Sequence, residues 1–349
     1  MKILYHLTIP PPKISGSDAV VQDVTALRDR FGGKIVYLNP NARLPVRLPR
    51  IGFGFHQLRR LRHLEGQYRL HHIFNPDPFP FPVLRCLQRP IVYSLSGGVG
   101  QKRPNLRFFS SLAAITVSDE QSLARLAWWG LDNVHLARPG IDTARFSCTP
   151  LAMQPTIRLM AGSAPWSRAQ FRSKGVDALL AAAKQCPQLH LVFLWRGVLA
   201  AEMTQRVKNM GVESQVEILN KRVDVNRVLA GVHAGIALAD EPQIIRPYPH
   251  SLIESLAAGK PVIVSRSIAM SNYVEQNGCG QIVEQLDAPH ILDAVSALRR
   301  SYPALCRAAA RAGKQDFGIE QMLTCLGRIY ERVQESAEKP PAHLPTAIR

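Results

Sequence analysis

Two successive series of short apolar runs, separated by segments with helical periodicity, constrain the fold of this chain most strongly. Each run is continuously apolar, as expected of parallel strands that are buried on both faces, and the alternation with helices is typical of parallel α/β folds. The predicted strands are residues 3–7, 34–38, 70–74, 91–95, 113–117 and 134–137, and then 157–161, 189–194, 216–219, 235–238, 262–264 and 281–283. We therefore predict an α/β protein with two doubly wound sheets.

The length of 349 residues agrees with two domains, at about 100–200 residues per domain. A polar, proline-bearing stretch at 147–155 predicts the linker, so that the front domain covers 1–146 and the back domain 156–318. A helix at 319–335 and a disordered tail at 336–349 complete the predicted organisation. In the front domain we expect a helix after the first strand, over 18–31, with Ser17 as its N-cap.

Composition excludes several classes of protein. A hydrophobic content of 46% is too high for a disordered chain, and no apolar run approaches the roughly 18 residues of a membrane-spanning helix. The six cysteines (86, 148, 186, 279, 306 and 325) lack metal-ligand spacing. We therefore expect a reduced, cytoplasmic protein without a disulfide framework or a zinc site.

The net charge of +17 points to an anionic partner. Residues 1–150 hold 20 Lys and Arg against 9 Asp and Glu, and the remainder holds 23 against 17. Nucleic acid, an anionic membrane or a phosphorylated substrate would be attracted, although a basic surface without any specific partner is the alternative.

The positive charge is densest between residues 43 and 62. Phe55, Leu58, Leu61 and Leu64 recur there at near-helical spacing, and Arg59, Arg60 and Arg62 occupy much of the remaining surface. Such a helix can lie on an anionic bilayer with its apolar edge buried in the lipid. A helix that packs its apolar edge on the core and solvates its cations is the alternative.

Residues 244–265 combine a loop, a helix and a strand. Pro249 precedes the expected helix, so that the backbone N–H groups of His250, Ser251 and Leu252 are available at its N-terminus. A helix N-terminus of this kind binds phosphate groups. Glu254 would lie on the same side and could accept hydrogen bonds from a ribose diol; the alternative is an ordinary helix with Glu254 in solvent.

A second segment supports a phosphate site. The strand at 157–161 ends at Gly162 and Ser163, and Arg172 and Lys174 stand just before the next helix. Cations at this position can reach a diphosphate in the cleft, whereas the alternative is two solvated loop cations.

These segments, taken in order, resemble the GT-B glycosyltransferases, especially glycosyltransferase family 4. In the back half the resemblance rests on Arg138-Pro-Gly-Ile-Asp142, Lys174-Gly-Val-Asp177, Glu254-Ser-Leu-Ala-Ala-Gly-Lys-Pro-Val262 and Gly278-Cys-Gly-Gln-Ile-Val283. In the front half it rests more loosely on the loop at Gly16, His72 to Pro76, and the segment 94–98.

The resemblance implies two Rossmann-like domains that face a cleft and a retaining transferase whose donor is a UDP- or GDP-linked sugar. No metal and no cofactor are implied. The back domain would bind the donor, with its base against Asn220, Arg222 and Val223. The front domain would bind the acceptor near His72 and Ser96, and the helix at 319–335 would return to that domain.

Three positions depart from the family pattern. Arg246 stands where the first carboxylate of the E-x(7)-E motif is expected, so that only Glu254 remains. Ser163 replaces an Arg, and Ser96 replaces a His. Arg246 could face a negatively charged donor, or it could mark weak or lost catalysis. The resemblance assigns the catalytic positions to Arg246, Glu254 and Lys174.

Three functions follow from these features. The favoured one is synthesis of a lipid-linked or cell-envelope glycan in the cytoplasm, with peripheral attachment to the inner face of the membrane. A transferase or binding protein acting on nucleic acid is the second, and a sugar-nucleotide-binding pseudoenzyme is the third.

Overall fold

The computed structural model describes residues 2–11, 18–41, 47–148, 151–195 and 198–338. The first sheet is built from residues 3–136, and every strand pair in it is parallel. In spatial order it consists of β2 (Gly33–Tyr37), β1 (Ile3–Leu7), β3 (Leu70–Asn75), β4 (Ile91–Leu95), β5 (Ala114–Val117) and β6 (Val134–Leu136). Its connections contain α1 (Ala19–Phe31), α2 (Leu58–Glu65), α3 (Leu106–Phe109) and α4 (Glu120–Trp128). Short 3-10 helices occur at Arg50–Gly52, Phe55–Gln57, Pro82–Cys86 and Thr143–Arg145.

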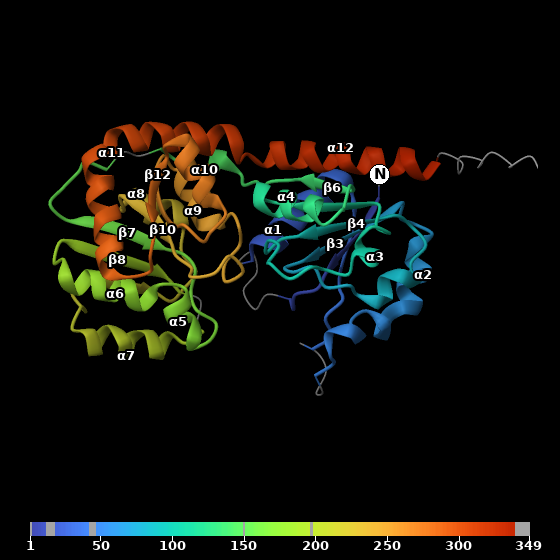
Figure 1. Ribbon diagram of the computed structural model, residues 1–349, viewed down its shortest axis with the longest axis horizontal. Helices are drawn as coiled ribbons and strands as arrows, with labels where there is room; N and C mark the ends of the chain where they lie inside the picture. Colours follow the sequence, from blue (N-terminus) through green and yellow to red (C-terminus); the bar gives the residue numbers. More distant parts are fainter. Residues whose placement is uncertain (1, 12–17, 42–46, 149–150, 196–197, 339–349) are drawn as a thin grey trace, which may run out of the picture.

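The second sheet repeats this architecture and is also parallel. Its spatial order is β12 (Gly280–Val283), β11 (Val262–Ser265), β10 (Ala234–Ala237), β7 (Ile157–Ala161), β8 (Leu189–Leu194) and β9 (Val216–Leu219). Its helices are α5 (Ala169–Ser173), α6 (Val176–Gln185), α7 (Ala200–Met210), α8 (Val225–Ala230), α9 (His250–Ala257), α10 (Met270–Asn277) and α11 (Ala288–Asp316). The two sheets with their helices lie side by side in Figure 1.

The predicted α/β class with two doubly wound sheets is confirmed. The strand order places β1 between β2 and β3 in the first sheet and β7 between β8 and β10 in the second. The side on which successive strands are added reverses at these points, and open α/β sheets bind ligands in the crevice beyond the carboxyl ends of such strands. A ligand-binding site is therefore expected among the residues that follow β7 and β10.

Helix α1 begins one residue later than predicted. Asp18, rather than Ser17, is its N-cap, and the Asp18 carboxylate accepts hydrogen bonds from the amides of Val20 and Val21 at 2.8 and 3.2 Å. Ser17 itself lies outside the described residues. Gly32 ends the helix with a φ of 70°, which a glycine adopts without strain.

The C-terminal region contains two long helices. One 29-residue helix, α11, contains Pro303 and is followed by α12 (Ile319–Glu338), so residues 336–338 are helical instead of belonging to a tail. Helix α12 runs along the N-terminal sheet domain (Figure 1), where Met322, Leu326 and Tyr330 are buried in the same hydrophobic cluster as β1. The domain boundaries proposed from the sequence stay a prediction.

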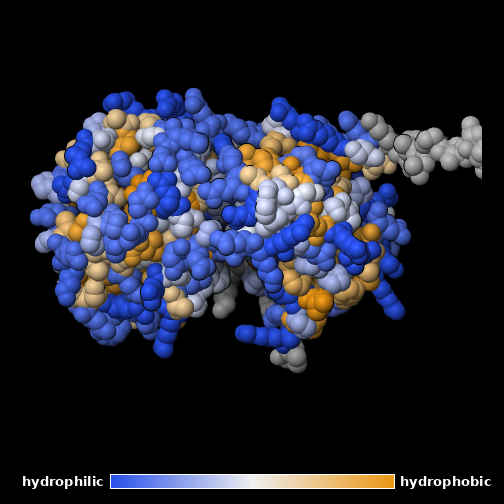
Figure 2. All heavy atoms as spheres, in the orientation of Figure 1, coloured by the Kyte–Doolittle hydropathy of each residue, from blue (hydrophilic) through white to orange (hydrophobic). Residues whose placement is uncertain are grey.

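The apolar edge of α2 faces the protein interior, which corrects the expected lipid-facing edge. Leu61 is fully buried in the core of the N-terminal sheet domain, and Leu58 and Leu64 pack against that core. Arg59, Arg60 and Arg62 are exposed. The apolar side chains that do reach solvent nearby are Ile51 and Phe55. Figure 2 shows mostly hydrophilic residues on the visible face of the molecule, with apolar residues scattered among them.

Candidate functional site

The carboxyl end of β7 contacts the N-terminus of α9, as the strand order leads one to expect. A Cβ atom added to Gly162 would lie only 2.5 Å from the Cβ of Ser251, so a larger residue at 162 would force the two segments apart. Helix α9 packs just as closely on β10, since a Cβ added to Gly235 would lie 2.2 Å from the Oγ of Ser255. Two segments that the sequence pointed to independently are thus adjacent in space.

Lys174 lies at the same place. It is 7% exposed, and its Nζ donates hydrogen bonds to the Oγ of Ser163 at 3.2 Å and to the carbonyl of Ala164 at 3.1 Å. Burial lowers the pKa of Lys174 to about 8, so most of these side chains carry a positive charge at neutral pH. A cation that is partly removed from water interacts strongly with a phosphate group.

One of the three amides predicted to bind phosphate is used within α9. Pro249 is the N-cap, and its carbonyl already accepts hydrogen bonds from the amides of Leu252 (3.0 Å) and Ile253 (3.2 Å). The Leu252 amide is therefore committed within the helix, which corrects its assignment to the phosphate site. The amides of His250 and Ser251 precede these bonds, at the end of the helix where the dipole is positive.

The other residues predicted for the donor site are more dispersed. Glu254 is half-buried, one turn after the start of α9, and Arg172 is exposed two positions before Lys174. Asn220 and Arg222 are exposed and Val223 is half-buried in the loop after β9, which is at one edge of the sheet, two strands from β7. Gly16 lies outside the described residues.

Arg246 lies where the two sheet domains meet. We call this contact, formed by Asp23, Ser96, Arg246 and His250, the seam. The Nε of Arg246 donates to the carbonyl of Ser96 at 3.4 Å, and its Nη2 is 3.2 Å from Oδ2 of Asp23 on α1. The Nε2 of His250 lies 3.5 Å from Oδ1 of the same carboxylate. Nearby, a Cβ on Gly98 would approach Cγ of Pro247 to 2.9 Å, so the loop after β4 packs tightly on the loop before α9.

Asp23 was missed by the sequence reasoning. It is 5% exposed, and burial raises its pKa to about 6 although the charge of Arg246 acts in the opposite direction. A signal was present, because Asp23 is three residues after Val20 and four before Leu27 and so shares the buried face of α1 with them. A carboxylate on an apolar helical face is uncommon unless it is paired.

His72 is not an acceptor-side residue. Its side chain is fully buried, with Nδ1 2.6 Å from the hydroxyl of Tyr330 and Nε2 2.7 Å from the Oγ of Ser94. His72 therefore joins β3 to β4 and to α12. Ser96, one strand away, does lie at the seam through its carbonyl group.

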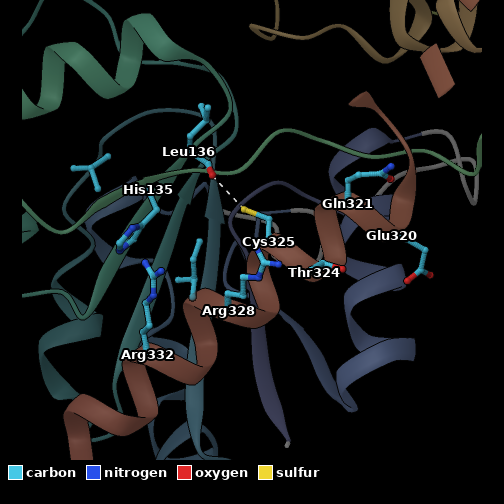
Figure 3. Close-up of a pocket in the computed structure, with 10 residues that line it drawn as sticks. His135, Leu136, Glu320, Gln321, Thr324, Cys325, Arg328 and Arg332 are labelled. Atoms are coloured by element: carbon cyan, nitrogen blue, oxygen red, sulfur yellow. Dashed lines mark hydrogen bonds between the residues drawn. The ribbon is translucent and has the colours of Figure 1, made fainter. Parts of the chain in front are cut away.

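A groove of about 750 Å³ between β6 and α12 contains none of the predicted site residues (Figure 3). It is lined by residues of both elements, including His135, Cys325, Arg328 and Arg332. Among the residues described, no group of three or more His, Cys, Asp or Glu side chains is arranged to hold a metal ion. No helix within the described ranges is long and apolar enough to cross a membrane.

The fold is that of the GT-B class. Sucrose-phosphate synthase from Thermosynechococcus elongatus superposes with a TM-score of 0.73 at 15% identity, over 96% of this chain and 100% of that chain. HepE from Anabaena, solved with UDP-glucose, gives 0.69 at 15% identity, over 96% and 100%. WaaG, a glycosyltransferase involved in lipopolysaccharide biosynthesis, gives 0.65 at 14% identity, over 94% and 99%.

The sequence comparison identifies the same class in the C-terminal domain. Residues 163–301 match the family described as glycosyl transferases group 1, which confirms the resemblance inferred from the motifs. The matched segment starts at Ser163 and includes Lys174, Arg246 and all of α9. None of the curated proteins compared with the chain matches it.

Proposed function

We propose that this protein is a retaining glycosyltransferase that transfers a sugar from a nucleotide diphosphate-sugar to a glycan or lipid-linked acceptor in cell-envelope or polysaccharide synthesis. The observation that carries the proposal is the meeting of Ser163, Lys174 and the α9 N-terminus beyond β7, within the segment that matches the glycosyl transferases group 1. A positive helix end and a buried cation at one point suit a diphosphate.

The chain's own groups stabilise the departing diphosphate in this mechanism. The amides of His250 and Ser251 and the ammonium of Lys174 are fixed before the reaction, so they can stabilise the charge that develops on the leaving group without reorganising. Retention requires the acceptor to attack from the face that the diphosphate leaves, and diphosphate oxygens would then take the acceptor proton. Glu254 would hold the ribose, and the loop after β9 would contact the base.

Two structural neighbours support the choice of donor and acceptor. HepE was solved with UDP-glucose, and WaaG takes part in lipopolysaccharide biosynthesis. Both likenesses concern the fold, so a UDP-linked donor and an envelope acceptor are proposals for this chain. The exposed arginines of α2 support contact with an anionic membrane, by charge rather than by the apolar edge of that helix.

The test is binding of UDP, GDP and their hexose conjugates by calorimetry, followed by a hydrolysis assay for each donor that binds. Glu254→Ala is expected to weaken donor affinity by about 1–3 kcal/mol, the scale of a lost charge-assisted hydrogen bond. Glu217→Ala, an exposed glutamate on β9, is the matched control and should leave affinity unchanged. Binding without hydrolysis or transfer would favour the pseudoenzyme, and binding of nucleic acid in place of any nucleotide sugar would contradict the proposal.

A further inference from the structure

The pair formed by Asp23 and Arg246 joins the two domains at the proposed donor site. Asp23 belongs to α1 of the N-terminal sheet domain, whereas Arg246 stands four residues before the start of α9. Their ion pair measures 3.2 Å, and the Ser96 carbonyl holds the same guanidinium from the N-terminal side. The positive charge of Arg246 is therefore already compensated by a carboxylate of this chain.

The pair leaves one acceptor and one donor unused. Oδ1 of Asp23 and Nη1 of Arg246 are both shielded from solvent and make no hydrogen bond, although Nε2 of His250 lies 3.5 Å from Oδ1. Buried polar atoms in native proteins are almost always paired, so an orphaned acceptor beside an orphaned donor points to a ligand that completes them. A hydroxyl group both donates and accepts, and it is therefore the group that satisfies both atoms.

The location identifies the part of the substrate. The seam lies next to the α9 N-terminus, where the diphosphate is expected, and the Asp23 carboxylate is 3.5 Å from the ring of His250, the first residue of α9. A sugar attached to that diphosphate would lie next to the seam. Resting on the proposed function, we infer that Asp23 is a further donor-site residue and that, with Arg246, it binds hydroxyl groups of an uncharged sugar.

The charges of Asp23 and Arg246 determine the preference for neutral over acidic sugars. A sugar that carries a carboxylate would bring a second negative charge beside Asp23, while the charge of the Arg246 guanidinium is already compensated by Asp23. Like charges in a poorly hydrated site repel strongly. Arg246 is then a partner for Asp23 and not a receptor for an acidic donor, the role that its place in the sequence had suggested.

The experiment compares two donors that differ only at C6, namely UDP-glucose and UDP-glucuronate, with UDP alone as the reference. If the protein binds GDP instead, GDP-mannose and GDP-mannuronate are used. The wild type should bind the neutral sugar at least about tenfold more tightly than the acidic one. Asp23→Asn should shrink or reverse this ratio and leave the affinity for UDP unchanged.

Arg246→Gln is the second variant, and it should act in the opposite direction. It leaves the ionised form of Asp23 without its counter-charge, although the loss of Arg246 also raises the pKa of Asp23. In measurements at alkaline pH, where Asp23 is ionised, discrimination against the acidic sugar should therefore widen by about tenfold, which a merely structural role of the pair would not produce. Asp29→Asn, an exposed aspartate on the same helix, is the matched control and should change nothing.

The outcomes separate the two proposals. Failure of the wild type to bind UDP, GDP or any of the sugars would overturn the proposed function itself. Normal binding of the nucleotide, together with equal affinity for neutral and acidic sugars, or a ratio that neither variant changes, would overturn the role of Asp23 and leave the proposed function standing.

Discussion

The two sheet domains share one topology but place their buried polar groups differently. In the N-terminal domain, polar side chains of the central strands bond to one another and to residues of α2 and α12: His6 to His71, His71 to Glu65, and His72 to Ser94 and Tyr330. In the C-terminal domain, Lys174 and Ser163 lie beyond the end of β7, where a ligand can reach them. The difference indicates that the first network serves the fold and the second serves the site.

The histidine network has a defined proton arrangement. The Glu65 carboxylate accepts from Nε2 of His71, which leaves Nδ1 of His71 to accept from Nε2 of His6, at 2.9 Å in each case. Burial opposes the charge of Glu65, but hydrogen bonds from His71 and from two backbone amides hold its pKa below the usual range. The histidines are thus neutral, and they fix the position of β1 relative to β3 and α2.

The largest expected effect is on the stability of the N-terminal domain. His72→Leu leaves the buried hydroxyl of Tyr330 without its partner, which costs about 1–3 kcal/mol. It also removes one of the two hydrogen bonds of Ser94, whose hydroxyl keeps Thr116 as a partner, and this loss costs about 1 kcal/mol. We expect the free energy of unfolding of this domain to fall by about 4 kcal/mol. Urea denaturation followed by hydrogen exchange in peptides from β3 measures it.

Tyr302→Phe in the C-terminal domain is the control. It removes one hydrogen bond, from the Tyr302 hydroxyl to the carbonyl of His233, and should cost about 1 kcal/mol. Equal losses in the two variants would show that the histidine network contributes no more to the fold than an isolated hydrogen bond.

The second prediction concerns charge on the outer surfaces. Arg59→Glu, Arg60→Glu and Arg62→Glu together should reduce binding to anionic vesicles by about 3 kcal/mol, since each cation near such a surface contributes about 1 kcal/mol. Co-sedimentation with vesicles of neutral and anionic lipid measures this change at low and physiological salt. The same triple reversal at Lys184, Lys208 and Arg227, which are exposed on the C-terminal domain, should have little effect. Equal losses of vesicle binding in the two triple variants would mean that no particular face of the protein docks on the membrane.

The third prediction tests the close packing of the α9 N-terminus against the end of β7. Gly162→Ala places a Cβ 2.5 Å from the Cβ of Ser251, so the helix N-terminus must shift, and overpacking of this kind costs about 2 kcal/mol. We expect donor affinity to fall by about tenfold, measured by calorimetry. Gly231→Ala in the same domain meets only ordinary contact, with the nearest atom at 3.6 Å, and should bind as the wild type does.

The strands could be predicted because buried parallel strands are continuously apolar, and the bounds of β1, β4, β7, β8 and β9 agree with the sequence prediction. Local backbone bonding was harder to predict. The sequence pattern assigns the amide of Leu252 to a ligand, but this amide donates its hydrogen bond to the carbonyl of Pro249. In the same way, the sequence offers both Ser17 and Asp18 as the N-cap of α1, and Asp18 is the residue that caps the helix.

Long-range pairing could not be predicted at all. Nothing local distinguishes His72, which bonds to Tyr330 across 258 positions, from a histidine that faces the cleft. Asp23 meets Arg246 across 223 positions and across a domain boundary. In each case the residue's own helix or strand pattern indicated burial, while the partner depended on how distant segments pack.

The smallest expected effect is a difference in acid sensitivity between the domains. Burial lowers the pKa of His72 to about 3 and also lowers the pKa values of His6 and His71. An unfolded chain binds protons at these histidines below about pH 6.5, whereas the folded domain does not, so folding loses stability as the pH falls. Asp23 acts in the opposite direction, because its pKa is raised to about 6 and the folded state therefore takes up a proton between about pH 6 and pH 4.

Between pH 7 and pH 6 the histidine effect dominates, since three histidines contribute to it, whereas Asp23 is a single group that is only half protonated at pH 6. The N-terminal domain should therefore lose about 1 kcal/mol more than the C-terminal domain, where burial lowers the pKa of His233 but no network of histidines is found among the described residues. Hydrogen exchange in peptides from β1 and β3 against β7 and β8, corrected for the intrinsic pH dependence of exchange, measures the difference. A larger loss in the C-terminal domain, or a gain in the N-terminal one, would mean that these histidines are charged in the folded protein and that their network does not have the proton arrangement deduced from its geometry.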